Sequence, residues 1–199
     1  MAVGTGVRDI YTAAYIRNGN VVTYGAPAKL ARLVSANPSI NTSDDQKFYA
    51  DDAEAETANG IFTSGTLTLN VDGIDSDIRK TLFGATQRTI NGVSGVGHSA
   101  DSDPAYVGAG YVEREMYLGQ TYYVPVFFPK TKFNPSFREA QTQGETIEFQ
   151  ALELSASILR TDEPSHDYVF IGDRKETAAE ALADLLKLFG ASATSSSGE

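Results

Sequence analysis

Alternation of apolar and polar residues with a period of two runs through most of this chain. It is clearest in GTLTLNV, residues 65–71, where Leu67, Leu69 and Val71 are separated by threonine and asparagine. Because successive side chains of a strand point to opposite faces, this period is typical of a half-buried strand. Similar signals predict strands at 11–16 and 20–24, joined by a turn at RNG, and at 29–36, 120–129 and 146–160. The chain is therefore predicted to be mainly β.

Two of these strands contain irregularities. Pro125 and Pro129 lie within or at the end of 120–129, and proline cannot donate a hydrogen bond to a ladder. We therefore expect this strand to lie at a sheet edge or to contain a bulge. In 146–160 the apolar residues switch from odd to even positions near Gln150 and Ala151, so the apolar face of the strand changes side. This predicts a long bent strand or two strands that change sheet.

Two segments have helical spacing instead. A short helix is predicted at 75–84, with Asp75 as its N-cap and Gly84 as its stop. A longer amphipathic helix is predicted at 172–190, beginning with a capping-box-like pair of Asp173 and Glu176. Its apolar stripe consists of Ala178, Leu182, Leu185, Leu186 and Phe189.

The remaining segments are polar and rich in glycine and serine. Residues 35–45 and 91–104 are predicted to be loops, and the serine-rich end, 191–199, a disordered tail. The expected organisation is one β domain over 1–172, a C-terminal helix over 173–190 and the tail.

Composition excludes several classes of protein. The 199 residues include 26 acidic and 16 basic side chains, for a net charge of −10, which argues against tight sequence-independent binding to nucleic acid. The absence of cysteine excludes disulfides and thiolate metal sites. No secretory signal is predicted, and no apolar run approaches the roughly 20 residues that span a bilayer. We therefore expect a soluble cytosolic protein or part of a particle assembled in the cytosol.

The densest acidic stretch lies in FYADDAEAETANG, residues 48–60. A helix–loop–helix calcium site requires a central glycine, which 51–56 lacks, although another calcium site or a catalytic carboxylate pair is a rival interpretation. The interpretation we favour is a strand in which Glu54 and Glu56 share a solvated face and Ala53 and Ala55 share a packed one.

No enzyme is predicted. His98 and His166 are the only histidines, neither lies at metal-ligand spacing from the other, and both are expected to be exposed and inert. The segment GVSGVG, 92–97, lacks the lysine of a phosphate-binding loop, and no nucleophile motif is present. We expect neither cofactor nor metal.

A group of basic and aromatic residues lies at 129–140. Cations between aromatic rings can bind single-stranded nucleic acid, but in an acidic chain they can equally contact the acidic face of another subunit. These candidate subunit-contact residues are Lys130, Lys132, Phe133, Phe137 and Arg138.

The order of patterns along the chain resembles a known family. The segments are RDIYTAAY, AKLARLVSANPSIN, YADDAEAET, GTLTLNVDGID, AGYVEREM, YYVPVFFPKTKFNPSFREAQTQGETIEFQ and a C-terminal helix. They look like the major tail protein, or tail tube protein, of bacteriophages with long non-contractile tails. The resemblance covers roughly residues 7–172.

This resemblance implies a β-sandwich or barrel-like subunit with a helix on its flank. Subunits of that family form rings, commonly hexameric, that stack into a tube inside the virion after assembly in the host cytoplasm. The implied partners are other copies of the chain, a tape-measure protein, a tail terminator and double-stranded DNA that passes without tight binding; no membrane is implied.

Two site hypotheses follow. Carboxylates that face the channel would let phosphates pass, and the candidates are Glu54, Glu56, Glu148 and Glu153. The polar segment 35–50 would be an arm that reaches an adjacent ring, with Asn37, Pro38, Ile40, Phe48 and Tyr49 as its contacts. In the rival interpretation, acidic 44–56 faces outward and the arm is a surface loop.

Other functions stay open. A head–tail joining or tail-terminating protein would stop at one ring. A carbohydrate-binding β-sandwich usually exposes tryptophan, which is absent here, although several tyrosines could replace it: Tyr106, Tyr111, Tyr117, Tyr122 and Tyr123.

Overall fold

The computed structural model describes residues 2–44, 46–50, 53–58, 60–138 and 150–190. The strands are β1 (Val3–Asn18), β2 (Val21–Tyr24), β3 (Ala28–Ala31), β4 (Leu33–Thr42), β5 (Gln46–Ala50), β6 (Ala53–Ala58), β7 (Phe62–Val71), β8 (Thr86–Ile90), β9 (Val93–Gly97), β10 (Tyr106–Tyr117), β11 (Gln120–Phe133), β12 (Leu152–Leu159) and β13 (Phe170–Ile171). The helices are α1 (Ser76–Phe83) and α2 (Ala178–Leu188). The predicted mainly-β class is confirmed.

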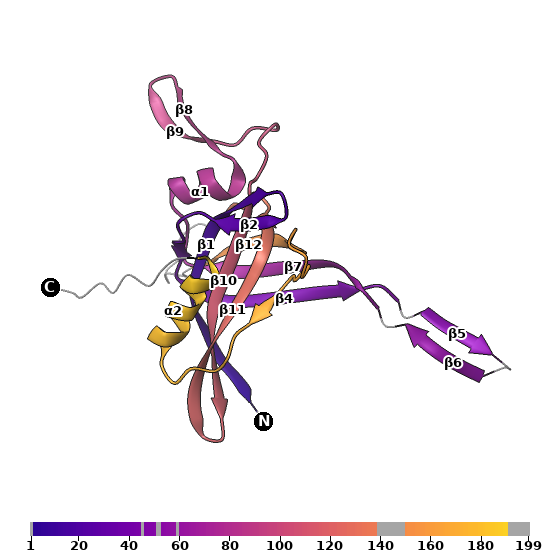
Figure 1. Ribbon diagram of the computed structural model, residues 1–199. Coiled ribbons are helices and arrows are strands. Elements are labelled where there is room, and N and C mark those ends of the chain that lie inside the picture. The colour runs from indigo at the N-terminus through magenta and orange to yellow at the C-terminus, as the bar shows by residue number, and fades with distance from the viewer. Residues whose placement is uncertain (1, 45, 51–52, 59, 139–149, 191–199) are drawn as a thin grey trace.

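One large antiparallel sheet forms the body. Its strands follow the order β2-β1-β10-β11-β12-β7-β4, with β3 paired to β1 and β13 paired to β11. Only Arg32 separates β3 from β4, so the chain that pairs with β1 at one end of the row runs directly into the strand that pairs with β7 at the other end. The row is thereby rolled into a barrel-like shape (Figure 1).

The core fills the inside of this shape. Leu67, Leu69 and Val71 of β7 are fully buried, as the alternating pattern predicted. Their cross-strand partners on β12 continue the same layer, since Leu154 and Leu152 face them in register. Cross-strand apolar pairs of this kind are the main stabilising unit of a sheet.

The helices occupy two different places. α1 covers one end of the body and buries Leu82 and Phe83, and Gly84 ends it in the left-handed conformation, as predicted. α2 packs on the outer surface of β10 and β11 (Figure 1). A Cβ at Gly110 of β10 would lie 2.5 Å from Leu185 Cδ1, so the helix approaches the sheet this closely only because that residue is glycine.

Several expectations about local structure were wrong. Segment 35–45 is strand β4 as far as Thr42, and segment 91–104 contains strand β9, because both pair with neighbouring strands in spite of their polar sequences. The 29–36 strand is divided at Arg32. The capping box of α2 is formed by Thr177 and Glu180, not by Asp173 and Glu176, so the helix starts later than predicted.

The proline-containing strand β11 is only partly as expected. It lies inside the sheet between β10 and β12, so the edge position is wrong. The alternative, a bulge, is confirmed: Phe128 pairs with Ala109 and Thr131 with Val107, which leaves one extra residue at Pro129 and Lys130. Residues 146–149 and the tail 191–199 lie outside the described residues.

Three hairpins leave the body in different directions (Figure 1). β8 and β9 extend from one end, and the β10–β11 turn lies at the opposite end. The third is the longest, because β4 and β7 run out of the body together and lead into β5 and β6. In the part of the chain that the structure describes, neither helix is long and apolar enough to cross a lipid bilayer.

Replacing Leu185 with alanine tests the packing of α2. Leu185 is fully buried beneath the helix, so Leu185→Ala is expected to lower the free energy of unfolding by about 2–5 kcal/mol, measured by urea denaturation. Lys187→Ala, on the exposed side of the same helix, should change it by less than about 0.5 kcal/mol. Equal losses in the two variants would contradict this packing.

Candidate functional site

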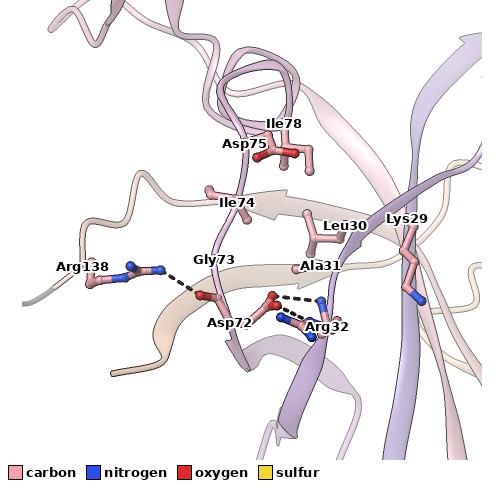
Figure 2. A pocket seen from close by; sticks show the side chains of 10 residues that line it. All are labelled: Lys29, Leu30, Ala31, Arg32, Asp72, Gly73, Ile74, Asp75, Ile78 and Arg138. Atoms are coloured by element: carbon pink, nitrogen blue, oxygen red, sulfur yellow. Dashed lines mark hydrogen bonds and ion pairs between the residues drawn. The ribbon is translucent and has the colours of Figure 1, made fainter. Parts of the chain in front are cut away.

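A polar cleft lies where the β4–β7 ribbon joins the body. It has a volume of about 580 Å³ and lies between the β3–β4 junction and the loop that connects β7 to α1 (Figure 2). The residues that line it are Lys29, Leu30, Ala31, Arg32, Asp72, Gly73, Ile74, Asp75, Ile78 and Arg138.

Asp72 connects two arginines in this cleft. Its carboxylate accepts hydrogen bonds from the backbone N–H of Arg32 at 3.1 Å and from Arg32 Nε at 2.5 Å. Its carbonyl oxygen accepts a hydrogen bond from Arg138 Nη2 at 2.7 Å. Figure 2 shows the two guanidinium groups reaching Asp72 from opposite sides. They are therefore held within a few ångströms of the same residue.

Glycine at position 73 makes this arrangement possible. A Cβ there would lie 2.8 Å from Arg138 Nη2, and the φ angle of Gly73 is +155°. The close approach of the Arg138 guanidinium to the loop thus depends on the missing side chain.

Most of the charged side chains around the cleft are paired. Lys29 binds Asp9 at 3.0 Å and Arg32 binds Asp72, whereas Arg138 donates to a backbone carbonyl. The side chain of Arg32 is 86% exposed. It uses its Nε and backbone N–H on Asp72, so the other guanidinium donors face solvent.

The N-terminus of α1 also lies at the cleft. Asp75 occupies the N-cap position, but its side chain makes no capping hydrogen bond. The first backbone N–H groups of a helix carry partial positive charge, and they attract anions when no side chain caps them. Chemically, the cleft is suited to hold carboxylates between two guanidinium groups, with Leu30 and Ile78 as an apolar wall.

The five candidate subunit-contact residues lie in different environments. Lys130 binds Asp162 at 2.7 Å and lies over the rings of Tyr15 and Tyr106, and Lys132 binds Asp103 at 2.8 Å. Both lysines therefore have partners within the subunit. Phe133 is fully buried in the core, so its side chain is not available to another subunit.

Phe137 and Arg138 are the two residues of that group that lie on the surface. Phe137 is 65% exposed and packs edge-on against His98, and Arg138 lies in the cleft. Their neighbour in sequence, Phe133, differs because it belongs to β11 and faces the barrel interior, whereas 134–138 follow that strand.

The acidic and arm residues come together on the projecting ribbon. Asn37, Pro38 and Ile40 lie on β4 and pair with β7. Further out, Phe48 pairs with Glu56 and Tyr49 with Glu54, so the arm anchors and two of the channel candidates belong to one hairpin.

The register of this hairpin corrects one expectation. It shifts between the pairs of Phe48 and Tyr49, so the strict alternation that was expected to put Glu54 and Glu56 on one face is interrupted. Of the other channel candidates, Glu153 is exposed on β12, and Glu148 lies outside the described residues.

His98 and Tyr111 also depart from expectation, whereas His166 is exposed as predicted. His98 was expected to be exposed, but it lies between Phe83 and Phe137, and its Nδ1 is buried without a hydrogen-bond partner in the described part of the chain. Tyr111 is buried, and burial raises its pKa to about 12, so it does not contribute to a carbohydrate-binding surface. Within the described ranges, no three His, Asp or Glu side chains form a group that could hold a metal ion.

Sequence reasoning missed the cleft. Arg32 was placed inside a predicted strand and Asp72 at the end of another, with no signal that the two strands end side by side. Their contact extends the β4–β7 ladder, in which Leu33 faces Val71, and it joins residues 40 positions apart. The DGID turn after a strong strand was the one local signal, because glycine and aspartate there mark a tight turn before a helix.

No model of a known protein family matches the chain, and no curated protein matches it. The resemblance to tail tube proteins therefore stays a prediction from the sequence patterns given above.

The pKa of Asp72 provides a test of the cleft geometry. The hydrogen bond from Arg32 holds the pKa of this carboxyl below its ordinary value of 3.8. The contribution to stability is therefore present above the unfolded-state pKa and is lost as the pH falls through the folded-state pKa. In Arg32→Ala, we expect the Asp72 pKa to rise toward 3.8 in an NMR titration of the carboxyl groups, with a smaller loss of stability in acid.

Arg138→Ala is the matched control. Arg138 donates to the Asp72 carbonyl and not to its carboxylate, so this substitution should leave the carboxyl titration nearly unchanged. An Asp72 pKa that is the same in wild type and Arg32→Ala would contradict the geometry.

Proposed function

We propose that this protein is a structural subunit that assembles with copies of itself into stacked rings, forming the tail tube of a bacteriophage. The proposal combines the resemblance in sequence order with the barrel-like body, the flanking α2 and the three hairpins that leave the body (Figure 1).

The observation that supports it most is the isolation of the β5–β6 hairpin. These strands pair with each other and with no other described strand, at the end of a ribbon that leads away from the body (Figure 1). A two-stranded hairpin is marginally stable alone in water, because it has no third strand or helix to cover a face. A long projection of this kind is explained if it contacts another molecule.

Self-association is favoured over other partners because the hairpins project from different sides of the subunit. A contact between two different patches of the same chain is heterologous, and such contacts build closed rings or open tubes. Exposed apolar residues lie at two opposite ends of the subunit. Ile90 and Val93 are on the β8–β9 hairpin, and Leu118 is on the β10–β11 turn. Exposed apolar tips at both ends suit subunits that stack.

Carboxylates lining the channel remain part of this proposal. Double-stranded DNA is held by clustered lysine and arginine, and a wall of negative charge lets it pass without exchanging its counterions. Glu153 is a described candidate, because it is exposed on the outer surface of β12. A tape-measure protein and a tail terminator would set the tube length.

Electron microscopy of the purified full chain tests the proposal. We expect tubes of variable length in negative stain, with assembly increasing with protein concentration. Single rings that do not stack would instead support a head–tail joining or tail-terminating role. A sample that stays monomeric at high concentration would contradict self-assembly.

A variant without the hairpin is the control for this experiment. Ser43 N–H donates to the Ile61 carbonyl at 2.8 Å, so residues 44–60 can be replaced by a short turn without moving the ends of β4 and β7. This variant should keep the thermal stability of the body and lose assembly. Tubes of normal length from it would remove the role given to the hairpin.

A further inference from the structure

We propose that Leu118, at the tip of the β10–β11 hairpin, is an assembly contact that packs against Ile90 and Val93 at the tip of the β8–β9 hairpin of a second copy. Such a contact rests on the proposed function, since it would join one ring to the next. Leu118 is a residue that the fold of the subunit alone does not explain.

Leu118 has a backbone conformation that leucine rarely adopts. Four non-glycine residues in the described part of the chain have a positive φ, and three of them are Asp9, Asn91 and His166. Aspartate, asparagine and histidine are the residue types that tolerate this region, whereas a bulky apolar residue there is an outlier. Leu118, with a φ of +50°, is the exception among the four.

The β8–β9 hairpin provides a comparison within the same chain. In both hairpins a two-residue turn joins the strands. The φ angles are +51° and +82° at Asn91 and Gly92, and +50° and +81° at Leu118 and Gly119. Two-residue turns in which both φ angles are positive strongly favour Asn-Gly. Folding alone would therefore favour asparagine at position 118.

The side chain of Leu118 contributes little to the subunit that carries it. It is 81% exposed, more than any other large apolar side chain in the described ranges. Because it buries so little apolar surface, it does not offset the cost of the left-handed backbone. Residues that keep an unfavourable backbone conformation are concentrated at functional sites. A contact outside the subunit accounts for both the exposure and the backbone.

The turn between β10 and β11 is firmly supported by its surroundings. β1 extends the hairpin to three strands, since Val3 pairs with Met116 two positions before the turn. Arg174 binds Glu115 and lies over the ring of Tyr117, 4.5 Å from its centroid. Val3 and Met116 are themselves exposed, so they extend the apolar surface around the tip. A tip held in this way loses little conformational entropy when a partner covers it.

A second copy is the partner that fits this tip. Two copies with a net charge of −10 repel one another over most of their surfaces, so they approach most readily through uncharged segments. Residues 116–123 and 89–97, which form the tips of the two hairpins, contain no charged side chain. Ile90 and Val93 are cross-strand partners, and both are exposed.

The positions of the two tips make the contact repeat. They lie at opposite ends of the subunit (Figure 1). A contact between them is therefore heterologous, and it leaves each copy with one free tip of each kind. Such a contact propagates along a stack of rings.

Leu118→Asn tests the inference, because folding and assembly should respond differently. The subunit should keep or gain thermal stability, since asparagine suits the left-handed turn. Tubes should need a protein concentration about ten-fold or more above that of wild type, because an apolar side chain is lost from each contact between rings. Thermal unfolding is measured below the assembly concentration, and assembly is measured by sedimentation and negative-stain microscopy.

Three further variants test the partner surface and control for general effects. Ile90→Ser with Val93→Ser should raise the assembly concentration by a similar factor. Leu118→Met keeps an apolar side chain of similar volume and should assemble close to the wild-type concentration. Val21→Ser removes an exposed apolar side chain from β2, outside both hairpins, and should assemble like wild type.

The outcomes separate this inference from the proposed function. Tubes of Leu118→Asn at the wild-type concentration, or a loss of thermal stability in this variant, would overturn the contact while wild-type tubes uphold the function. Normal assembly of the Ile90 and Val93 double variant would show that Leu118 meets a different surface, which also overturns the contact as stated. A wild type that forms no tubes would refute the proposed function, and with it any contact between rings.

Discussion

The pairing of β4 with β7 is the constraint on which the rest of the structure depends. At its base this ribbon belongs to the barrel, where Leu67, Leu69 and Val71 are buried against β12. Beyond Gly65 the alternation stops, and the residues of both strands become mostly exposed. The same two strands therefore close the core and carry a projection away from it. The two strands leave the body where the apolar residues of β7 end, because a strand packs against a core only as long as one of its faces is apolar.

Ion pairs elsewhere in the subunit determine where unpaired charge remains on its surface. Several carboxylates each engage two cations: Asp9 contacts Arg8 and Lys29, and Asp184 contacts Lys175 and Lys187. The hydrogen bond from Lys130 and a second from Tyr15 hold the pKa of Asp162 below its ordinary value, and this carboxylate also binds Arg17. With 16 cations for 26 acids, pairing of this kind leaves a large negative surplus on the rest of the chain. Exposed pairs contribute little stability each, so their main effect is on where free charge remains.

The mainly-β class and the positions of most strands could be predicted, because a two-residue period reflects burial on one face. α1 was predictable from Asp75 and Gly84 because helix ends have local signals. The strand residues at 37–42 and 93–97 were not predicted, since their polar side chains are exposed and pairing with a neighbour, rather than burial, makes them strands. Phe133 and Lys130 were assigned alike from a shared stretch, although one lies in the core and the other pairs with Asp162. Three positions separate the two residues in β11, and this odd spacing puts their side chains on opposite faces of the strand.

Barrel closure also limits how copies of this chain can join. Most strands of the body have partners on both sides within the sheet, and closed sheets leave few edges for uncontrolled pairing. Association must then use what lies outside the barrel: the β4–β7 ribbon with its hairpin, the hairpin tips and the cleft. These features belong to different sides of the subunit, so a contact that joins two of them is directional. β4, whose ten residues span roughly 33 Å as an extended strand, sets how far from the body the hairpin can make such a contact.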